Sequence, residues 1–372
     1  MAPYPFTTIE PNRGVAAIRA PCPHREKGTA CTPGNAKCVD GIRWVPVNLV
    51  DVPGLVPGAH EGKGLGHKFL DDLRAADGFV QVVDLTGATD AEGRLAAPGS
   101  QDPAEEVQWL EEELVDWVAE ILGRDFSRQA RSVELEGKKV EEFLAQRLTG
   151  LSVGPAALAA ALRAHPVDRA HPSSWTDEER QALARGLLRS SKPRLIAANK
   201  CDRSDRAHAD TLASELGDLP VVPTAADAEL TLRRAARGGL IDYHPGDPSF
   251  TIREPTRLSP AQAKALDALR AVMTAWGGTG VQPALERMVY DRLHQIVVYP
   301  VEDETHWTDS KGRILPDALL VPADTPAREV AFRVHTELGE NFIRAIDGRT
   351  HRAIGAEQHV AANSVIRIVS RK

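Results

Sequence analysis

The chain has 372 residues, of which 42% are hydrophobic and 26% are charged. This length predicts two or three domains, because a single ordinary core rarely grows that large. The formal net charge of -7 excludes a uniformly basic nucleic-acid binder, although local basic patches could still contact RNA. There is no apolar run of about 18 residues and no apolar secretory segment, and four cysteines are too few for a disulfide framework. We therefore expect a cytoplasmic protein that has no membrane partner and is a monomer.

Short apolar runs alternate with helical spacing in the first part of the chain. Residues 43–50 (RWVPVNLV) and 78–83 (GFVQVV) each end at an aspartate, and residues 66–76 between them have the spacing of a helix face. Such alternation is typical of a parallel α/β sheet. We therefore predict that residues 1–100 form the first part of an α/β domain.

The pattern becomes helical beyond this point and later returns to strands. Residues 101–191 carry apolar side chains at helical spacing, which predicts a helical insertion. Residues 192–295 contain the runs RLIAA and LPVV, which predict that the sheet resumes. Residues 296–372 contain short strands and a helix over 326–338, and they predict a small α+β module.

A DxxG pattern follows the first predicted strand. In a doubly wound sheet, ligands bind at the carboxyl ends of the strands. Asp51 at such an end could reach Mg²⁺ through water, and the amide of Gly54 could donate to a terminal phosphate. The pattern alone is weak, because many strands end in a polar turn.

An NKxD pattern, residues 199–202 (NKCD), follows a second predicted strand. The Asp202 carboxylate could accept hydrogen bonds from N1 and the 2-amino group of guanine. Asn199 could contact the other edge of the base, and the stem of Lys200 could lie over the ring. The alternative interpretation is a plain Asn/Asp turn.

A third pattern, Thr224-Ala225-Ala226, follows the next predicted strand. A backbone amide there could meet the carbonyl oxygen of guanine. Each pattern is weak by itself, but their order along the chain favours a guanine-nucleotide site.

The segments around these motifs resemble a known family. YPFTTIEPNRG, DVPGLVPGAHEGKGLGHKFLDDLRAAD, ANKCD and PTAADAEL are similar to the YchF family of Obg-related GTPases, in its archaeal-type branch, and residues 296–372 resemble its TGS domain. The likeness covers nearly the whole chain. It implies a GTPase-like α/β parallel sheet with a helical insertion and a C-terminal α+β TGS domain. It also implies GTP and Mg²⁺ as ligands, and the ribosome or translation factors as partners.

The resemblance assigns roles to individual residues. It makes Thr7 or Thr8 the switch I threonine that completes the Mg²⁺ shell, and it places Asp51 and Gly54 in switch II. Many bacterial members that prefer ATP have Glu where this chain has Asp202, so the intact NKxD pattern implies GTP.

The chain departs from the family at the phosphate-binding loop. The family begins with a strand and a Gly-x-x-x-x-Gly-Lys-Ser loop that holds the β and γ phosphates, and no such pattern occurs in the 372 residues. We expect weak nucleotide binding and a sheet without its central strand, and we favour a truncated gene model or an internal start over a genuine loss. The alternative function is a nucleotide-independent protein that binds ribosomes or RNA through the helical arm and the TGS domain.

Two residues are candidates for positioning the attacking water. Gln81 stands where some YchF relatives carry a histidine proposed for that task, and His60 in the GAHEGKGLG loop is the other candidate. The alternative interpretations are a structural glutamine on a strand and a solvated loop histidine.

A separate cluster predicts a possible zinc site. Cys22, His24, Cys31 and Cys38 lie in one short stretch and offer four soft ligands, which suffice for tetrahedral Zn²⁺. Their spacing is not that of a standard zinc ribbon, and reduced or redox-sensitive loop cysteines are the alternative. Cys201 is expected to be a spacer within the NKxD pattern.

Overall fold

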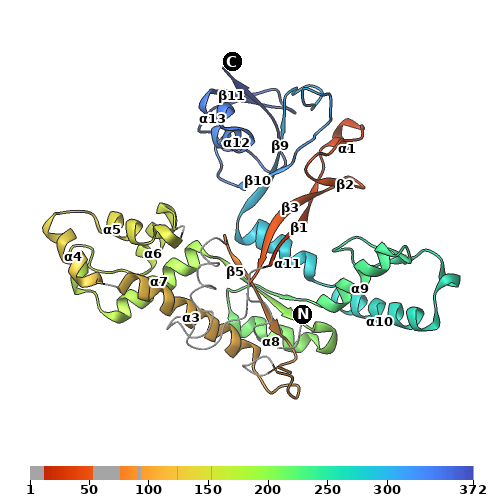
Figure 1. Ribbon diagram of the computed structural model, residues 1–372, viewed down its shortest axis with the longest axis horizontal. Helices are drawn as coiled ribbons and strands as arrows, with labels where there is room; N and C mark the ends of the chain where they lie inside the picture. The colour runs from red at the N-terminus through yellow and green to blue at the C-terminus, as the bar shows by residue number, and fades with distance from the viewer. Residues whose placement is uncertain (1–11, 53–75, 90–93, 124, 152, 372) are drawn as a thin grey trace. The chain divides into compact units, whose positions relative to one another are not determined.

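The computed structural model describes residues 12–52, 76–89, 94–123, 125–151 and 153–371 (Figure 1). Its contacts divide the chain into two compact units. The first unit contains Val50–Ala284, and the second combines Arg13–Leu49 with Leu285–Lys372. No helix among the described residues is both long enough and apolar enough to cross a membrane.

A parallel sheet organises the first unit. Its strands β4 (Phe79–Asp84), β5 (Arg194–Asn199) and β6 (Val221–Pro223) are hydrogen-bonded in that order. The first five residues of β5 are buried, as expected for a strand covered on both faces. Because the strands are parallel, their carboxyl ends meet at one edge of the sheet.

The described residues of the connection from β4 to β5 contain five α-helices. They are α3 (Pro103–Gly123), α4 (Phe126–Leu135), α5 (Val140–Arg147), α6 (Pro155–Ala164) and α7 (Asp177–Ser191). Helices α3 and α7 lie side by side (Figure 1). The segment has a hydrophobic core of its own, including Phe126, Leu144, Leu162 and Leu183. The predicted helical segment inside a parallel α/β sheet is therefore confirmed.

Capping explains where α7 begins. Thr176 accepts a hydrogen bond from the Glu179 amide, and the Glu179 carboxylate accepts one from the Thr176 amide. These paired bonds satisfy backbone donors that a helix start leaves open.

The rest of the first unit, apart from β6, follows β5 in the chain. It contains α8 (Arg206–Leu216), α9 (Ala226–Arg237), α10 (Pro260–Trp276), the short strands β7 (Ile241–Asp242) and β8 (Thr251–Ile252), and the start of α11 (Val281–Arg287). The buried Glu229 carboxylate accepts hydrogen bonds from Tyr243 Oη at 2.6 Å and Thr279 Oγ1 at 2.5 Å. These bonds stabilise the Glu229 carboxylate, whose burial without partners would be unfavourable.

A five-stranded sheet forms the C-terminal part of the second unit. Its order is β10 (Leu319–Pro322), β9 (Gln295–Val301), β13 (Val365–Ser370), β11 (Phe342–Asp347) and β12 (Ala353–Ile354). Strands β9 and β13 are parallel, and the other pairs are antiparallel. The predicted α+β class of this region is confirmed.

The single helix predicted over 326–338 is two helices. Helix α12 (Ala327–Val334) ends at His335, whose φ of -163° is extended, and α13 (Thr336–Glu340) begins directly after it. The His335 ring accepts a hydrogen bond from the Glu337 amide at 3.3 Å and so caps the second helix. The apolar spacing continues through the break, which is why the periodicity predicted one helix.

A smaller sheet completes the second unit, with order β1 (Asn12–Pro21), β3 (Ile42–Asp51) and β2 (Lys37–Val39). The one-turn helix α1 (His24–Lys27) follows β1. Ile18 and Val45 share a buried cluster with Tyr299, Trp307 and Val365. Residues 13–49 therefore pack with the C-terminal strands rather than with their neighbours in the sequence.

One half-buried carboxylate joins three elements of the first unit. Glu111 on α3 contacts Arg194 Nη2 on β5 at 2.5 Å, and on α7 it contacts Arg189 at 2.8 Å and Arg185 at 3.5 Å. The Glu111 side chain is 16% exposed and that of Arg194 is 7% exposed. An ion pair this deeply buried is costly to break, because the remaining charge has no water around it.

We predict that Glu111→Ala lowers the free energy of unfolding by about 3 kcal/mol, because it leaves Arg194 buried without its carboxylate. Urea denaturation followed by circular dichroism measures this. Glu112→Ala is the matched control, because the Glu112 side chain is 59% exposed and pairs with Arg185. The control should cost less than about 1 kcal/mol, as exposed pairs do. Equal losses in the two variants would contradict the importance of the buried pair.

Candidate functional site

The candidate nucleotide site lies where the parallel strands β4, β5 and β6 end. Asp84 and Asn199 are the last residues of β4 and β5 and stand opposite each other in the register. The Leu85 amide donates to the Asn199 carbonyl at 2.9 Å, which continues the pairing beyond the strands. Thr224, Ala225 and Ala226 follow β6 at the same edge. The structure therefore brings together the two motifs predicted after β5 and β6.

Lys200 is held by an ion pair that the sequence analysis missed. Its backbone is left-handed, with φ of 64°, and its Nζ lies 2.6 Å from Asp84 Oδ2. Thr86 donates to the other carboxylate oxygen, from its amide at 3.0 Å and from its hydroxyl at 2.6 Å. Burial alone would raise the pKa of Asp84, but these bonds from Lys200 and Thr86 hold that pKa below its ordinary value. Asp84 could have been found from its place at a strand end beside the NKxD strand.

Hydrogen bonds from backbone amides fix the loops after β5 and β6 to each other. Asn199 Oδ1 accepts from the Ala226 amide at 3.1 Å, and the Cys201 amide donates to the Thr224 carbonyl at 3.1 Å. The Ala225 amide donates to the Thr279 carbonyl at 2.8 Å. The base-reading candidates thus sit on one hydrogen-bonded framework.

Gly280 closes this framework from the other side. Its φ is +74°, and a Cβ built there would lie 1.9 Å from the carbonyl oxygen of Pro223 at the end of β6. Both the backbone angle and the close approach therefore require glycine.

Cys201 and Asp202 face different surroundings. Cys201 is fully buried within the core of the first unit, and burial raises the pKa of its thiol to about 12. It packs against the core in addition to being the predicted spacer. Asp202 is exposed and has a long ion pair, 3.8 Å, with the neighbouring Arg203. Its carboxylate is therefore available to a ligand.

The remaining predicted residues are placed as follows. Asp51 ends β3 and is exposed, and β3 pairs with β1 and β2 rather than with β4. Gln81 on β4 is buried, donates to the Glu106 carbonyl at 3.4 Å and accepts from Arg194 at 3.4 Å. These contacts give Gln81 structural partners, and its catalytic role stays a prediction. Thr7, Thr8, Gly54 and His60 lie outside the described residues.

Glu106, in the first turn of α3, is an acid that the sequence analysis missed. Burial, together with repulsion from the Asp84 carboxylate, raises the pKa of Glu106 to about 7 from its ordinary value of 4.5. The strand-end site therefore has one carboxylate that stays ionised and a second carboxyl group that titrates near neutral pH.

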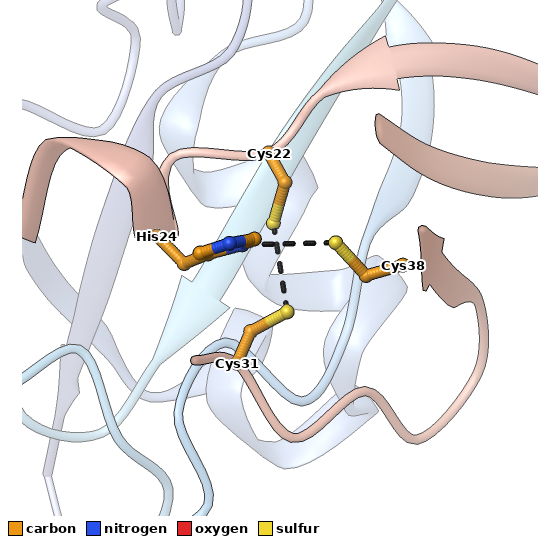
Figure 2. Close-up of side chains that lie close together, drawn as sticks. All are labelled: Cys22, His24, Cys31 and Cys38. Carbon is orange, nitrogen blue, oxygen red and sulfur yellow. Dashed lines mark hydrogen bonds between the residues drawn. The ribbon is translucent and has the colours of Figure 1, made fainter. Parts of the chain in front are cut away.

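The four candidate zinc ligands come together in the second unit. Their ligand atoms all lie within 4.8 Å of one another, and Figure 2 shows the side chains pointing toward a common centre. Cys22 Sγ is 3.9 Å from Cys31 Sγ, and Cys38 Sγ is 3.6 Å from His24 Nδ1. Burial and the neighbouring thiols raise the pKa of Cys38 to about 12, and burial lowers the pKa of His24.

The strand-end site presents three different polar side chains at one edge of the parallel sheet. Exposed Asp202 is an acceptor, Asn199 is oriented by the Ala226 amide, and Lys200 is a fixed cation. The Asp202 acceptor suits a base that has amide and amino hydrogens, and the carboxyl ends of parallel strands are the usual place for such ligands. The geometry therefore defines the class, an α/β protein with a candidate ligand site at the ends of its parallel strands.

Comparisons with known proteins identify the family. A family model described as Obg-like GTPase YGR210-like, G4 motif-containing domain, matches residues 197–303, and one described as 50S ribosome-binding GTPase matches residues 1–124. A GTP-binding protein of Methanocaldococcus jannaschii is 44% identical over 99% of this chain and 92% of its own length. A GTP-binding protein of Schizosaccharomyces pombe is 31% identical over 98% of this chain and 88% of its own length.

Solved structures agree with this result. The GTP binding protein from Pyrococcus horikoshii OT3 matches with a TM-score of 0.78 and 34% identity, over 97% of this chain and 93% of that one. The Schizosaccharomyces pombe YchF GTPase, at 16% identity and a TM-score of 0.53, shares the fold over 98% of this chain and 89% of that one. The chain belongs to the YchF-type, Obg-like family of GTP-binding proteins.

We predict that Glu106 makes stability depend on pH. Its pKa is raised in the native state, so between about pH 4.5 and 7 the folded protein holds a proton that the unfolded chain releases. This contribution is fully present below the unfolded pKa and is lost as the pH rises through the folded pKa. Glu106→Gln should abolish a decline of about 3 kcal/mol, measured by urea denaturation at several pH values. An unchanged decline in this variant would contradict the assignment.

Proposed function

We propose that this chain recognises GTP through its strand-end site. Asp202 accepts the two guanine hydrogen bonds, Asn199 contacts the other edge of the base, and Lys200 lies along the ring. In the Thr224-Ala225-Ala226 loop, the Ala226 amide, which donates to Asn199 Oδ1 at 3.1 Å, would be shared with the guanine carbonyl oxygen. The observation that carries the proposal is the framework that fixes Asn199 to Ala226 and Lys200 to Asp84.

We assign the metal and phosphate roles by the same reasoning. Asp51 and either Thr7 or Thr8 would hold Mg²⁺, and Gly54 would contact the terminal phosphate. His60 and Gln81 are the candidates for positioning water. Bound Mg²⁺ would neutralise phosphate charge, while these side chains orient the nucleotide and the water.

We further infer that GTP hydrolysis is impaired in a chain of these 372 residues. They contain no Gly-x-x-x-x-Gly-Lys-Ser pattern, so the amides and the lysine that cradle the phosphates have to be replaced by other groups. Base recognition depends on different residues and would persist.

We also propose that the protein acts at the ribosome. Residues 296–372 would form a TGS domain, and ribosomes or translation factors would be the partners, with RNA contacts available to local basic patches. Support comes from the ribosome-binding description of the family model that matches residues 1–124. The alternative is a nucleotide-independent protein that binds ribosomes or RNA through the helical arm and the TGS domain.

We predict that Asp202→Asn shifts the nucleotide preference from GTP toward xanthosine triphosphate. The variant loses the carboxylate that accepts two guanine hydrogen bonds, so GTP affinity should fall about 10- to 100-fold. Its amide can donate to the C2 carbonyl that xanthine has in place of the amino group. Affinity for xanthosine triphosphate should therefore rise. Isothermal titration with both nucleotides measures the exchange.

Asp210→Asn is the matched control for this experiment. Asp210 is an exposed aspartate on the neighbouring helix α8, and its change removes the same charge. The control should keep the GTP preference. A retained preference in Asp202→Asn, or an equal change in both variants, would refute the role of Asp202.

We predict that Asp84→Asn weakens GTP binding about 3- to 30-fold by removing a charge-assisted bond that fixes Lys200. The variant should weaken GTP and xanthosine triphosphate equally, because Asp84 would not read the base. Nucleotide titration measures both affinities. A change confined to GTP would show that Asp84 acts in some other way.

Ribosome binding separates the two functional proposals. Sedimentation of the protein with ribosomes should depend on added GTP if the nucleotide controls the interaction. Sedimentation that is identical with and without GTP, and identical in Asp202→Asn, would favour the nucleotide-independent alternative.

A further inference from the structure

We propose that Cys22, His24, Cys31 and Cys38 bind a structural zinc ion in the second unit. The four side chains would complete a closed tetrahedral shell of three sulfurs and one nitrogen. Such a shell leaves no open position for water or substrate, so the ion would stabilise the fold rather than catalyse a reaction. The proposal is independent of nucleotide binding.

The distances between ligand atoms fit zinc. With Zn–S bonds of about 2.3 Å and a Zn–N bond of about 2.0–2.1 Å, ligand atoms in a tetrahedral shell stand roughly 3.5–3.8 Å apart. The two closest pairs, Cys22 to Cys31 at 3.9 Å and Cys38 to His24 at 3.6 Å, are close to those separations. All other pairs lie within 4.8 Å, so only a small contraction is needed.

The local fold explains how a non-standard spacing produces this cluster. Cys22 directly follows β1, and His24 begins α1, so a short turn brings both side chains to one side. Cys38 lies in β2, which returns to β3 through Asp40 and Gly41. Both turn residues have positive φ, 48° and 75°, as a two-residue hairpin turn requires.

A buried arginine supplies an independent argument. Arg43 is 0% exposed and stands opposite Cys38 in the hairpin. Its Nη2 donates to the Leu315 carbonyl at 2.7 Å and lies 3.5 Å from Cys22 Sγ. Its Nε and Nη1 have no hydrogen-bond partner, and no described carboxylate pairs with it. A buried guanidinium without an anion is strongly disfavoured.

The zinc centre would supply the anion that Arg43 lacks. Three thiolates, one neutral imidazole and Zn²⁺ carry a net charge of minus one. The arginine charge beside Cys22 would then be balanced, and the sulfur would accept its hydrogen bond as a thiolate. The same residues without a metal leave an unbalanced cation next to three neutral thiols.

The ion would stabilise the loop of residues 22–38, which has few apolar side chains. Residues 32–35 are bonded to the 314–318 segment, through Thr32 to the Ile314 carbonyl at 2.8 Å and through Asn35 to both backbone groups of Ala318. Glu26 on α1 forms a two-pronged ion pair with Arg349 at 2.6 and 2.7 Å. The metal would hold the intervening cysteines in the same arrangement, so its removal should loosen residues 22–38.

A disulfide between Cys22 and Cys31 is the competing explanation. The two sulfurs are 3.9 Å apart, and a bond of about 2.05 Å would require them to close further. Such a bond would leave Cys38 and His24 without a role, and it would give Arg43 no anion. Metal content and a thiol count distinguish the two arrangements.

The decisive experiment is elemental analysis of the full chain, purified without chelator and without a metal-affinity tag. We expect one zinc ion per chain, and four titratable thiols after denaturation in chelator. Cobalt exchanged into the protein should show the absorption of tetrahedral thiolate coordination. Chelation should accelerate tryptic cleavage at Arg25, Lys27 and Lys37.

Variants separate coordination from folding. Cys31→Ser and His24→Ala should lose the zinc, whereas His24→Cys should keep it because a thiolate can replace the imidazole. Cys201→Ala is the matched control, since it removes the cysteine that lies outside the cluster, and it should keep the zinc. A wild-type protein without zinc, whether its thiols are free or paired, would overturn the proposal. Full zinc content in Cys31→Ser would overturn it as well.

Discussion

The parallel pairing of β4 with β5 places Asp84 directly opposite Asn199, and the contacts of the strand-end site depend on that register. It lets Lys200, the residue after Asn199, reach back to the Asp84 carboxylate. A slip of one residue would turn the alternating side chains to the opposite faces of the sheet and separate the ion pair. The buried residues of β5 oppose such a slip, because they would lose their cover on both faces.

The acidic side chains of this protein have different roles that depend on their solvent exposure and their neighbours. Glu229 is buried and Glu111 is half-buried, and both are engaged by cations or hydroxyl groups that join neighbouring elements. Asp202 is exposed and has only a distant arginine beside it. Glu106 is buried near another negative charge, and its pKa rises as a result. Surroundings rather than residue type therefore decide which acids hold the fold and which can meet a ligand.

The sequence predicted those features of the fold that depend on local sequence patterns. Apolar runs predicted β4, β5 and β6, helical spacing predicted the insertion, and the NKCD pattern placed Asn199, Lys200 and Asp202 at a strand end. What it missed depends on contacts between distant residues. The Lys200–Asp84 pair joins residues that lie far apart in the chain, and His335 interrupts a helix although the apolar spacing continues. The packing of residues 13–49 against the C-terminal strands is likewise a tertiary effect.

Gly280 shows how a residue without a side chain can limit variation at a binding site. No larger residue fits there unless the end of β6 moves, and the backbone of Thr224, Ala225 and Ala226 would move with it. The position offers no donor, acceptor or charge, so a search for chemically active side chains passes over it. In evolutionary terms, a substitution at this glycine would disturb the Thr224-Ala225-Ala226 loop as surely as a substitution at the aspartate proposed to read the base would disturb recognition.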